Sequence, residues 1–184
     1  MELTAAVFKD ELITRCKLGD VQGYEMLYQQ YSKAMYNTSL RIVNNTADAE
    51  DVLQESFVAA FRLDNFDYSS TFGAWLKRIV VNKSIDMLRR RKMVLVDIEE
   101  TSLQHAADTV PADEENIQLK VEEIRKTMKQ LPNGYRTVLS LHLFEGYDHE
   151  EIADILHVTQ STVRTQYHRA KQKLLQLLQK GGTT

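Results

Sequence analysis

Apolar residues recur at intervals of three and four along the first half of the chain. Between residues 21 and 43 this spacing predicts a long helix, and a second helix is expected from Thr46, the predicted N-cap, with acidic residues in its first turn. A third helix is predicted over residues 70–91 and a weaker one over residues 4–18. The pattern therefore predicts a four-helix unit at the N-terminal end.

The helical periodicity stops between residues 94 and 115, where the sequence is acidic and contains Pro111. Such a composition is typical of a flexible linker. Helical spacing resumes at residue 116, and Gly146 is placed to end a helix that runs through residues 138–143. We therefore predict an all-α fold of two small helical domains, residues 1–93 and 116–184, joined by a flexible acidic linker.

The C-terminal domain ends in a short helix and a long helix joined by the three-residue turn "HVT". Asp148 and Glu151 have the spacing of a capping box, which predicts the start of the short helix. Thr159 is the expected cap of the final helix, which should reach about residue 179. Two helices with this connection have the length and character of a helix-turn-helix.

The final helix has one apolar and one polar face. Val163, Tyr167 and Ala170 begin an apolar stripe that continues to residue 178 and should face inward. Arginine and hydroxyl side chains on the other face suit phosphates and base edges in the major groove. A solvated basic face is the alternative, but the capped short helix and the tight turn favour DNA reading. The predicted reading face comprises Ser161, Thr162, Arg164, Thr165, His168, Arg169 and Lys171.

Charge is distributed in alternating blocks, although the net charge of the 184 residues is only −3. Residues 44–67 contain six acids and one base, whereas residues 71–93 contain seven bases and one acid. Residues 96–116 contain seven acids and no base, whereas residues 158–180 contain five bases and no acid. The modest net charge thus hides two basic surfaces suited to nucleic acid.

The basic block "GAWLKRIVVNKSIDMLRRRK" follows a run of aromatic residues. Aromatic faces stack on unpaired bases while lysine and arginine track the backbone, so this composition suits single-stranded nucleic acid. For Phe72 and Trp75 taken singly, burial in the core is the favoured interpretation. The segment as a whole is expected to present a basic surface.

The cellular location and the absence of catalytic chemistry are both predicted from the residues and motifs of the sequence. Cys16 is the single cysteine, and neither a secretory signal nor an apolar run long enough to span a membrane is found, which predicts a cytoplasmic protein without membrane insertion. The five histidines show no ligand spacing, and the sequence has no phosphate loop or nucleophile elbow. We therefore expect no enzymatic activity, no metal and no cofactor.

The blocks in this order resemble a bacterial RNA polymerase sigma factor of the compact extracytoplasmic-function type. "GDVQGYEMLYQQY", "DAEDVLQESFVAAFRLDNF" and "FGAWLKRIVVNKSIDMLRRRK" are similar to the family's region two, and "LPNGYRTVLSLHLFEGYDHEEIADILHVTQSTVRTQYHRAKQKL" resembles region four. The resemblance covers nearly the whole chain. It implies that residues 1–93 bind polymerase and recognise the −10 promoter element, and that residues 116–184 recognise the −35 element.

The resemblance also implies roles for individual residues. The acidic helix would bind the coiled coil of the largest polymerase subunit, and residues 65–71 would capture a flipped base of the non-template strand. The implied polymerase contacts are Asp48, Asp51, Gln54, Glu55 and Phe57. The implied −10 and strand-opening residues are Asn65, Phe66, Tyr68, Ser69, Trp75, Arg78, Asn82, Lys83, Asp86, Arg89 and Arg90.

The sequence departs from the family pattern in the helix-turn-helix. His157 and Ser161 stand where many members have glycine, and His168 occupies a variable position of the recognition helix. Core polymerase, promoter DNA and an anti-sigma factor are the implied partners of a chain that is monomeric when free. The competing interpretations are a dimeric helix-turn-helix regulator that acts apart from polymerase, and a helical adaptor that binds only proteins.

Overall fold

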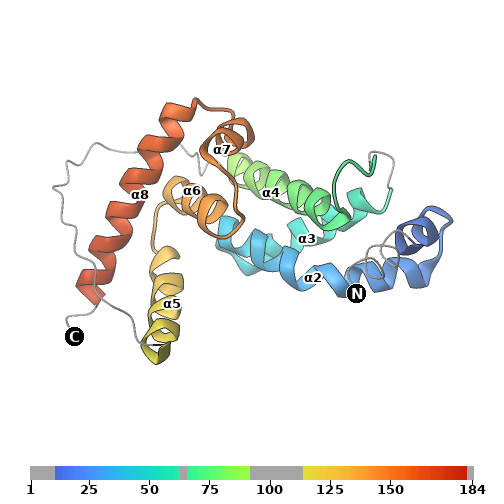
Figure 1. Cartoon of the computed structure of the whole chain (residues 1–184), viewed down its shortest axis with the longest axis horizontal. Helices are drawn as coiled ribbons and strands as arrows, with labels where there is room; N and C mark the ends of the chain where they lie inside the picture. Colours follow the sequence, from blue (N-terminus) through green and yellow to red (C-terminus); the bar gives the residue numbers. More distant parts are fainter. Residues whose placement is uncertain (1–10, 63–65, 92–113, 182–184) are drawn as a thin grey trace. The chain divides into compact units, whose positions relative to one another are not determined.

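The computed structural model describes residues 11–62, 66–91 and 114–181, and every regular element in these ranges is a helix. This confirms the all-α fold. Residues 11–17 are helical, and residues 4–10 of the predicted N-terminal helix lie outside the described ranges. The other helices (Figure 1) are α2 (Val21–Val43), α3 (Thr46–Ala60), α4 (Phe72–Arg90), α5 (Glu114–Met128), α6 (Asn133–Leu143), α7 (His149–Leu156) and α8 (Gln160–Gly181).

Contacts between Cα atoms divide the chain into two compact units, Met1–Leu88 and Arg89–Thr184. The linker predicted over residues 94–115 lies outside the described residues as far as residue 113, and α5 begins at Glu114. Each unit has its own hydrophobic core.

The core of the first unit is built where α2 packs against α3 and where α4 joins them (Figure 1). Leu27, Val52 and Leu76, one from each helix, have at most 1% of their surface exposed. A Cβ atom on Gly73 would lie 2.7 Å from Cε1 of Tyr31, so a side chain at this position would require the Tyr31 ring or α4 to shift. Farther along, Ser84 donates a buried hydrogen bond to Ser39, which links the same two helices.

The N-cap of α3 differs from the prediction. Asn44 ends α2 with a left-handed backbone at φ 55°, which leaves Asn45 extended at the start of α3. The Asn45 side chain then accepts a hydrogen bond of 3.0 Å from the backbone N–H of Asp48. Asn45 is therefore the cap, and Thr46 is the first helical residue.

The core of the second unit is built around α8, which contacts α5, α6 and α7 (Figure 1). The guanidinium of Arg136 is buried at the start of α6 and donates to the backbone oxygen of Leu131 at 2.8 Å. Burial lowers the pKa of Arg136 to about 10. Two apolar residues of this unit are exposed: Val121, in the middle of α5, by 40%, and Leu143, the last residue of α6, by 52%.

Candidate nucleic-acid interface

Helix α7 begins with the predicted capping box. One carboxylate oxygen of Asp148 accepts hydrogen bonds of 2.8 Å from the backbone N–H groups of Glu150 and Glu151. In return, the backbone N–H of Asp148 donates to the Glu151 carboxylate at 2.8 Å. Donors at the helix start are thus satisfied, which stabilises the short helix in front of the turn.

The turn after α7 depends on a left-handed residue. His157 has φ 58° and ψ 45°, a conformation that glycine adopts without steric cost. The N–H of Val158 donates to the carbonyl of Ala153, and the N–H of His157 donates to that of Asp154. This pair of bonds is a Schellman motif, in which the left-handed position is usually glycine, and here histidine forms the same turn.

Hydroxyl groups gather at the start of α8. Thr159 Oγ1 accepts a hydrogen bond of 3.2 Å from the backbone N–H of Thr162, which confirms Thr159 as the cap. The same oxygen lies 2.9 Å from Ser161 Oγ and 2.8 Å from Thr162 Oγ1. Thr165 donates to the backbone oxygen of Ser161 at 2.9 Å. Several hydroxyls are thereby presented on the first two turns of the helix, where helix-turn-helix proteins meet DNA.

Burial divides α8 as its periodicity predicted. Val163 and Ala170 are fully buried and Leu174 is 8% exposed, so this stripe fixes the helix to the unit's core. The predicted reading residues lie on the other side. Ser161, Arg164, Thr165, His168 and Lys171 are exposed, whereas Thr162 and Arg169 are half-buried.

One residue on this face was missed by the sequence analysis. Nε2 of Gln172 lies 3.1 Å from Nε2 of His168, one helical turn earlier. Positions four residues apart share a helix face, so the spacing itself could have indicated the pair.

The acidic helix α3 presents only part of the predicted polymerase contact. Asp51, Gln54 and Glu55 are exposed. Asp48 and Phe57 are each 3% exposed, and Phe57 belongs to the core of the first unit. Neither side chain can therefore touch a partner unless this unit rearranges.

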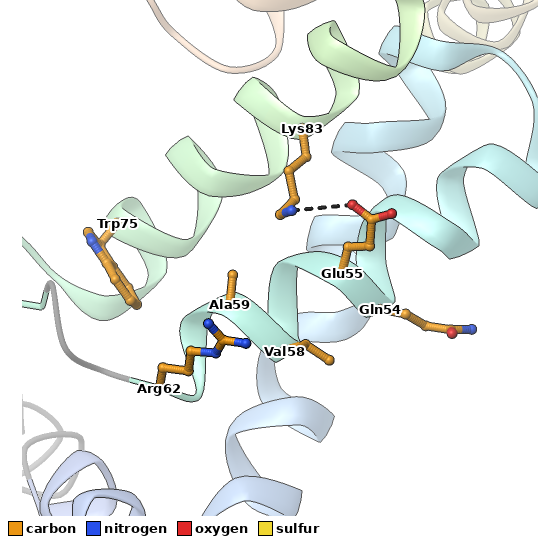
Figure 2. A pocket seen from close by; sticks show the side chains of 7 residues that line it. All are labelled: Gln54, Glu55, Val58, Ala59, Arg62, Trp75 and Lys83. Carbon is orange, nitrogen blue, oxygen red and sulfur yellow. Dashed lines mark hydrogen bonds and ion pairs between the residues drawn. The ribbon is translucent and has the colours of Figure 1, made fainter. Parts of the chain in front are cut away.

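A groove of about 600 Å³ lies between α3 and α4 (Figure 2), and it joins residues from two of the predicted sites. Figure 2 shows Lys83 of α4 reaching toward Glu55 of α3, with 3.2 Å between its Nζ and Oε2 of Glu55. A residue expected to bind polymerase is thus paired with one expected to bind DNA. The lining residues are Gln54, Glu55, Val58, Ala59, Arg62, Trp75 and Lys83.

Helix α4 exposes most of the residues predicted to open the promoter. Arg78, Asn82 and Asp86 follow one another at intervals of four and are exposed. Arg89 and Arg90 are exposed at the end of the helix. Phe72 is 3% exposed, and Trp75 is half-buried against the core, as expected for these aromatics taken singly. The stripe combines three arginines and a polar amide with one carboxylate, that of Asp86, so its net charge is positive and suits a nucleic-acid backbone.

The loop before α4 is built on an aromatic cluster. Phe66 is 5% exposed, and its ring centroid lies 5.2 Å from that of Trp75, so this contact anchors the loop to α4. Asn65 lies outside the described residues. Asp67 accepts a hydrogen bond of 2.9 Å from the backbone N–H of Ser69. Hydrogen bonds from the side chain and backbone of Ser69 hold the pKa of the Asp67 carboxyl below its ordinary value.

Tyr68 is the exposed aromatic residue of this loop. Its backbone is left-handed at φ 61°, and 47% of its surface is exposed. The Phe66 ring packs against it at 4.7 Å between centroids, and the ammonium of Lys17 lies 4.5 Å from the centre of the Tyr68 ring. This cation–π contact links the loop to the helix formed by residues 11–17.

In residues 11–62, 66–91 and 114–181, no three histidine, cysteine, aspartate or glutamate side chains gather closely enough to hold a metal ion. Among the same residues, no helix combines the length and the apolar character needed to cross a membrane.

Comparison with known proteins assigns a family to both units. The model of sigma-70 region 2 matches residues 27–93, and that of sigma-70 region 4 matches residues 121–174. The ECF RNA polymerase sigma factor SigW of Bacillus subtilis is 31% identical over 172 residues, which is 88% of this chain and 92% of SigW.

Two solved structures share the fold. The structure of CnrH in complex with the cytosolic domain of CnrY matches with a TM-score of 0.55 and 26% identity, over 93% of this chain and 97% of that one. RpoE from Bartonella quintana, solved with the anti-sigma factor NepR, matches with a TM-score of 0.56 and 22% identity, over 86% and 98% of the two chains. The chain belongs to the extracytoplasmic-function family of RNA polymerase sigma factors, and it is therefore a transcription initiation factor.

Proposed function

We propose that this chain binds core RNA polymerase, directs it to specific promoters and helps to open the DNA. The observation that carries the proposal is the match of two family regions to two helical units, each of which exposes a basic helix face. On this proposal residues 1–93 bind polymerase and the −10 element, and residues 116–184 read the −35 element. The reaction chemistry belongs to polymerase, so the chain itself is not an enzyme.

In this proposal the exposed residues of three helices have separate tasks. Asp51, Gln54 and Glu55 of α3 contact the coiled coil of the largest polymerase subunit. The stripe of α4 and the loop with Tyr68 engage the non-template strand, where an exposed aromatic ring can stack on an unpaired base. Arg164 and its neighbours on α8 enter the major groove.

The small number of basic residues on α8 means that specific DNA binding should depend on polymerase. The basic face of α8 contributes few phosphate contacts, so the isolated chain should bind DNA weakly and with strong salt dependence. Polymerase would hold both DNA-binding units on one scaffold, which makes the second contact intramolecular and raises the overall affinity. We further propose a cytoplasmic location and, from the family resemblance, regulation by an anti-sigma factor.

Run-off transcription from a promoter library tests the proposal directly. With core polymerase present, the chain should give promoter-dependent initiation, whereas the isolated chain should show weak promoter binding. Arg164→Ala combined with Arg169→Ala should abolish dependence on the −35 element and leave polymerase binding intact. The absence of promoter-dependent initiation across a broad library would overturn the proposal. Tight, specific binding of a stable dimer without polymerase would favour a conventional regulator.

A further inference from the structure

Lys17 and Tyr68 meet on the surface of the first unit. The ammonium of Lys17 lies 4.5 Å from the centre of the Tyr68 ring. Both side chains are exposed, that of Tyr68 by 47%. Tyr68 also packs against the buried ring of Phe66, with the two ring planes inclined at 52°. The Tyr68 ring is therefore held by one buried aromatic residue and one exposed cation.

Packing of the N-terminal helix fixes where Lys17 lies. Ile13 and Cys16, earlier in the same helix, are buried in the core that also contains Phe66. The hydroxyl of Tyr24 donates a hydrogen bond of 2.6 Å to the backbone oxygen of Cys16, which ties the end of this helix to α2. The backbone that carries Lys17 is thus anchored beside the loop, whereas its long side chain keeps its rotational freedom.

The loop itself supplies no cation. Residues 66–71 contain one charged side chain, the carboxylate of Asp67. A nucleic-acid strand that met this loop alone would face a negative charge, which repels its phosphates. The ammonium of Lys17 offsets this charge, because it contacts the loop at Tyr68.

We propose that Lys17 binds a phosphate of the single DNA strand whose base stacks on Tyr68. An aromatic face for the base and a cation for the backbone are the two parts of a single-strand site. The cation–π contact is exposed and therefore weak, so a base can take the ring face while the flexible lysine moves to a phosphate. A charge-assisted hydrogen bond to the phosphate then replaces the contact with the ring.

The family match gives no indication of this role. Lys17 lies ahead of residues 27–93, the part of the chain that matches sigma-70 region 2. The inference rests on the proposed function, because it assumes that the loop with Tyr68 engages the non-template strand.

Binding of single-stranded DNA to the full chain with core polymerase tests the inference. The probe is a labelled oligonucleotide, selected from a random pool because it binds the wild-type complex and not core polymerase alone. Lys17→Met keeps the length of the side chain and removes one cation. It should weaken binding about fivefold near 0.1 M salt and reduce the slope of log affinity against log salt by about 0.7. Lys17→Arg retains the cation and should keep most of the affinity and of the slope.

Lys33→Met is the matched control, because it removes one lysine from an exposed position of α2 and should leave affinity and slope unchanged. An unaltered affinity and salt slope in Lys17→Met would overturn the inference, and so would equal losses in Lys17→Met and Lys33→Met. A wild-type complex that selects no single strand would overturn it together with the proposed function. A chain that initiates normally, with the salt slope unaffected by Lys17→Met, contradicts only the role of Lys17.

Proton NMR of the full chain without polymerase supplies an independent readout. The ring current of Tyr68 should shift the ε-methylene protons of Lys17 upfield, and Tyr68→Leu should remove this shift. A wild-type chain without the upfield shift would lack the contact that places the ammonium at the loop, and this result would also overturn the inference. The shift does not depend on transcription, so it separates the contact from the proposed function.

Discussion

At the scale of single residues, this chain uses non-glycine residues in left-handed backbone positions at two of its proposed DNA-facing turns. Tyr68 and His157 have φ angles of 61° and 58°, where an L side chain crowds the backbone. At Tyr68 the ring is supported by Phe66 and Lys17, so surrounding contacts offset the conformational cost. His157 is exposed, and its conformation is fixed by backbone hydrogen bonds of the turn.

His157→Gly should therefore stabilise the C-terminal unit. Relief of left-handed strain is worth roughly 1–2 kcal/mol, and the added freedom of glycine in the unfolded chain offsets part of it, leaving a gain of about 0.5–1 kcal/mol. Urea denaturation followed by circular dichroism measures the change. Asp154→Gly, inside α7, is the control and should destabilise by a similar amount, since glycine weakens a helix interior. A destabilising His157→Gly would mean that the histidine side chain stabilises the turn.

At the scale of elements, capping decides where the helices of the reading unit begin. Helix α7 has only eight residues, from His149 to Leu156, which is too short to be stable without tertiary contacts and satisfied ends. The Asp148 carboxylate satisfies two donors at its start, and Ile152 buries its middle in the core. The position of the turn, and hence of α8, depends on this short helix.

Asp148→Ala should destabilise the C-terminal unit by about 1 kcal/mol, because it removes both cap hydrogen bonds and the charge at the positive end of the helix. Asp148→Asn retains the hydrogen-bond acceptor and should cost less, which separates the two contributions. Thermal and urea unfolding measure both variants. Equal losses for alanine and asparagine would assign the effect to charge alone.

Several helix boundaries were predictable from local patterns, whereas the choice between two adjacent cap residues was not. The periodicity predicted α2 at residues 21–43. The capping box and the Thr159 cap predicted where the two helices of the helix-turn-helix begin. The cap of α3 was misplaced by one residue, because the choice between Asn45 and Thr46 depends on the left-handed turn at Asn44. Propensity alone does not distinguish two adjacent residues that are both good caps.

At the scale of the whole molecule, an ion pair connects the surface proposed for polymerase to the surface proposed for DNA. The Glu55–Lys83 pair is partly exposed, so its net contribution to stability is about 0–1 kcal/mol. A polymerase cation that approached Glu55 could therefore compete with Lys83 at little energetic cost. Asp51 lies on the same exposed face of α3, one turn before Glu55, and has the charge expected to meet such a cation.

Asp51→Arg should weaken binding to core polymerase by about tenfold or more, because it replaces an attractive charge with a repulsive one at the proposed interface. Affinity can be measured by fluorescence anisotropy of a labelled chain titrated with core polymerase. Glu25→Arg on α2 makes the same charge reversal at another exposed site and should have little effect. Equal effects from the two variants would indicate a response to net charge and would argue against α3 as the docking helix.

The sequence by itself determined the all-α class, the basic and acidic blocks, and the polar face of α8, since each follows from local spacing and composition. Only the tertiary structure decided which members of those patterns are accessible. Asp48 and Phe57 belong to the acidic helix but are buried: α2 packs against α3, and Phe57 lies in the core that residues of α2, α3 and α4 share. Lys83 lies 28 positions from its partner Glu55. Long-range packing brings such residues together, and no local periodicity encodes it.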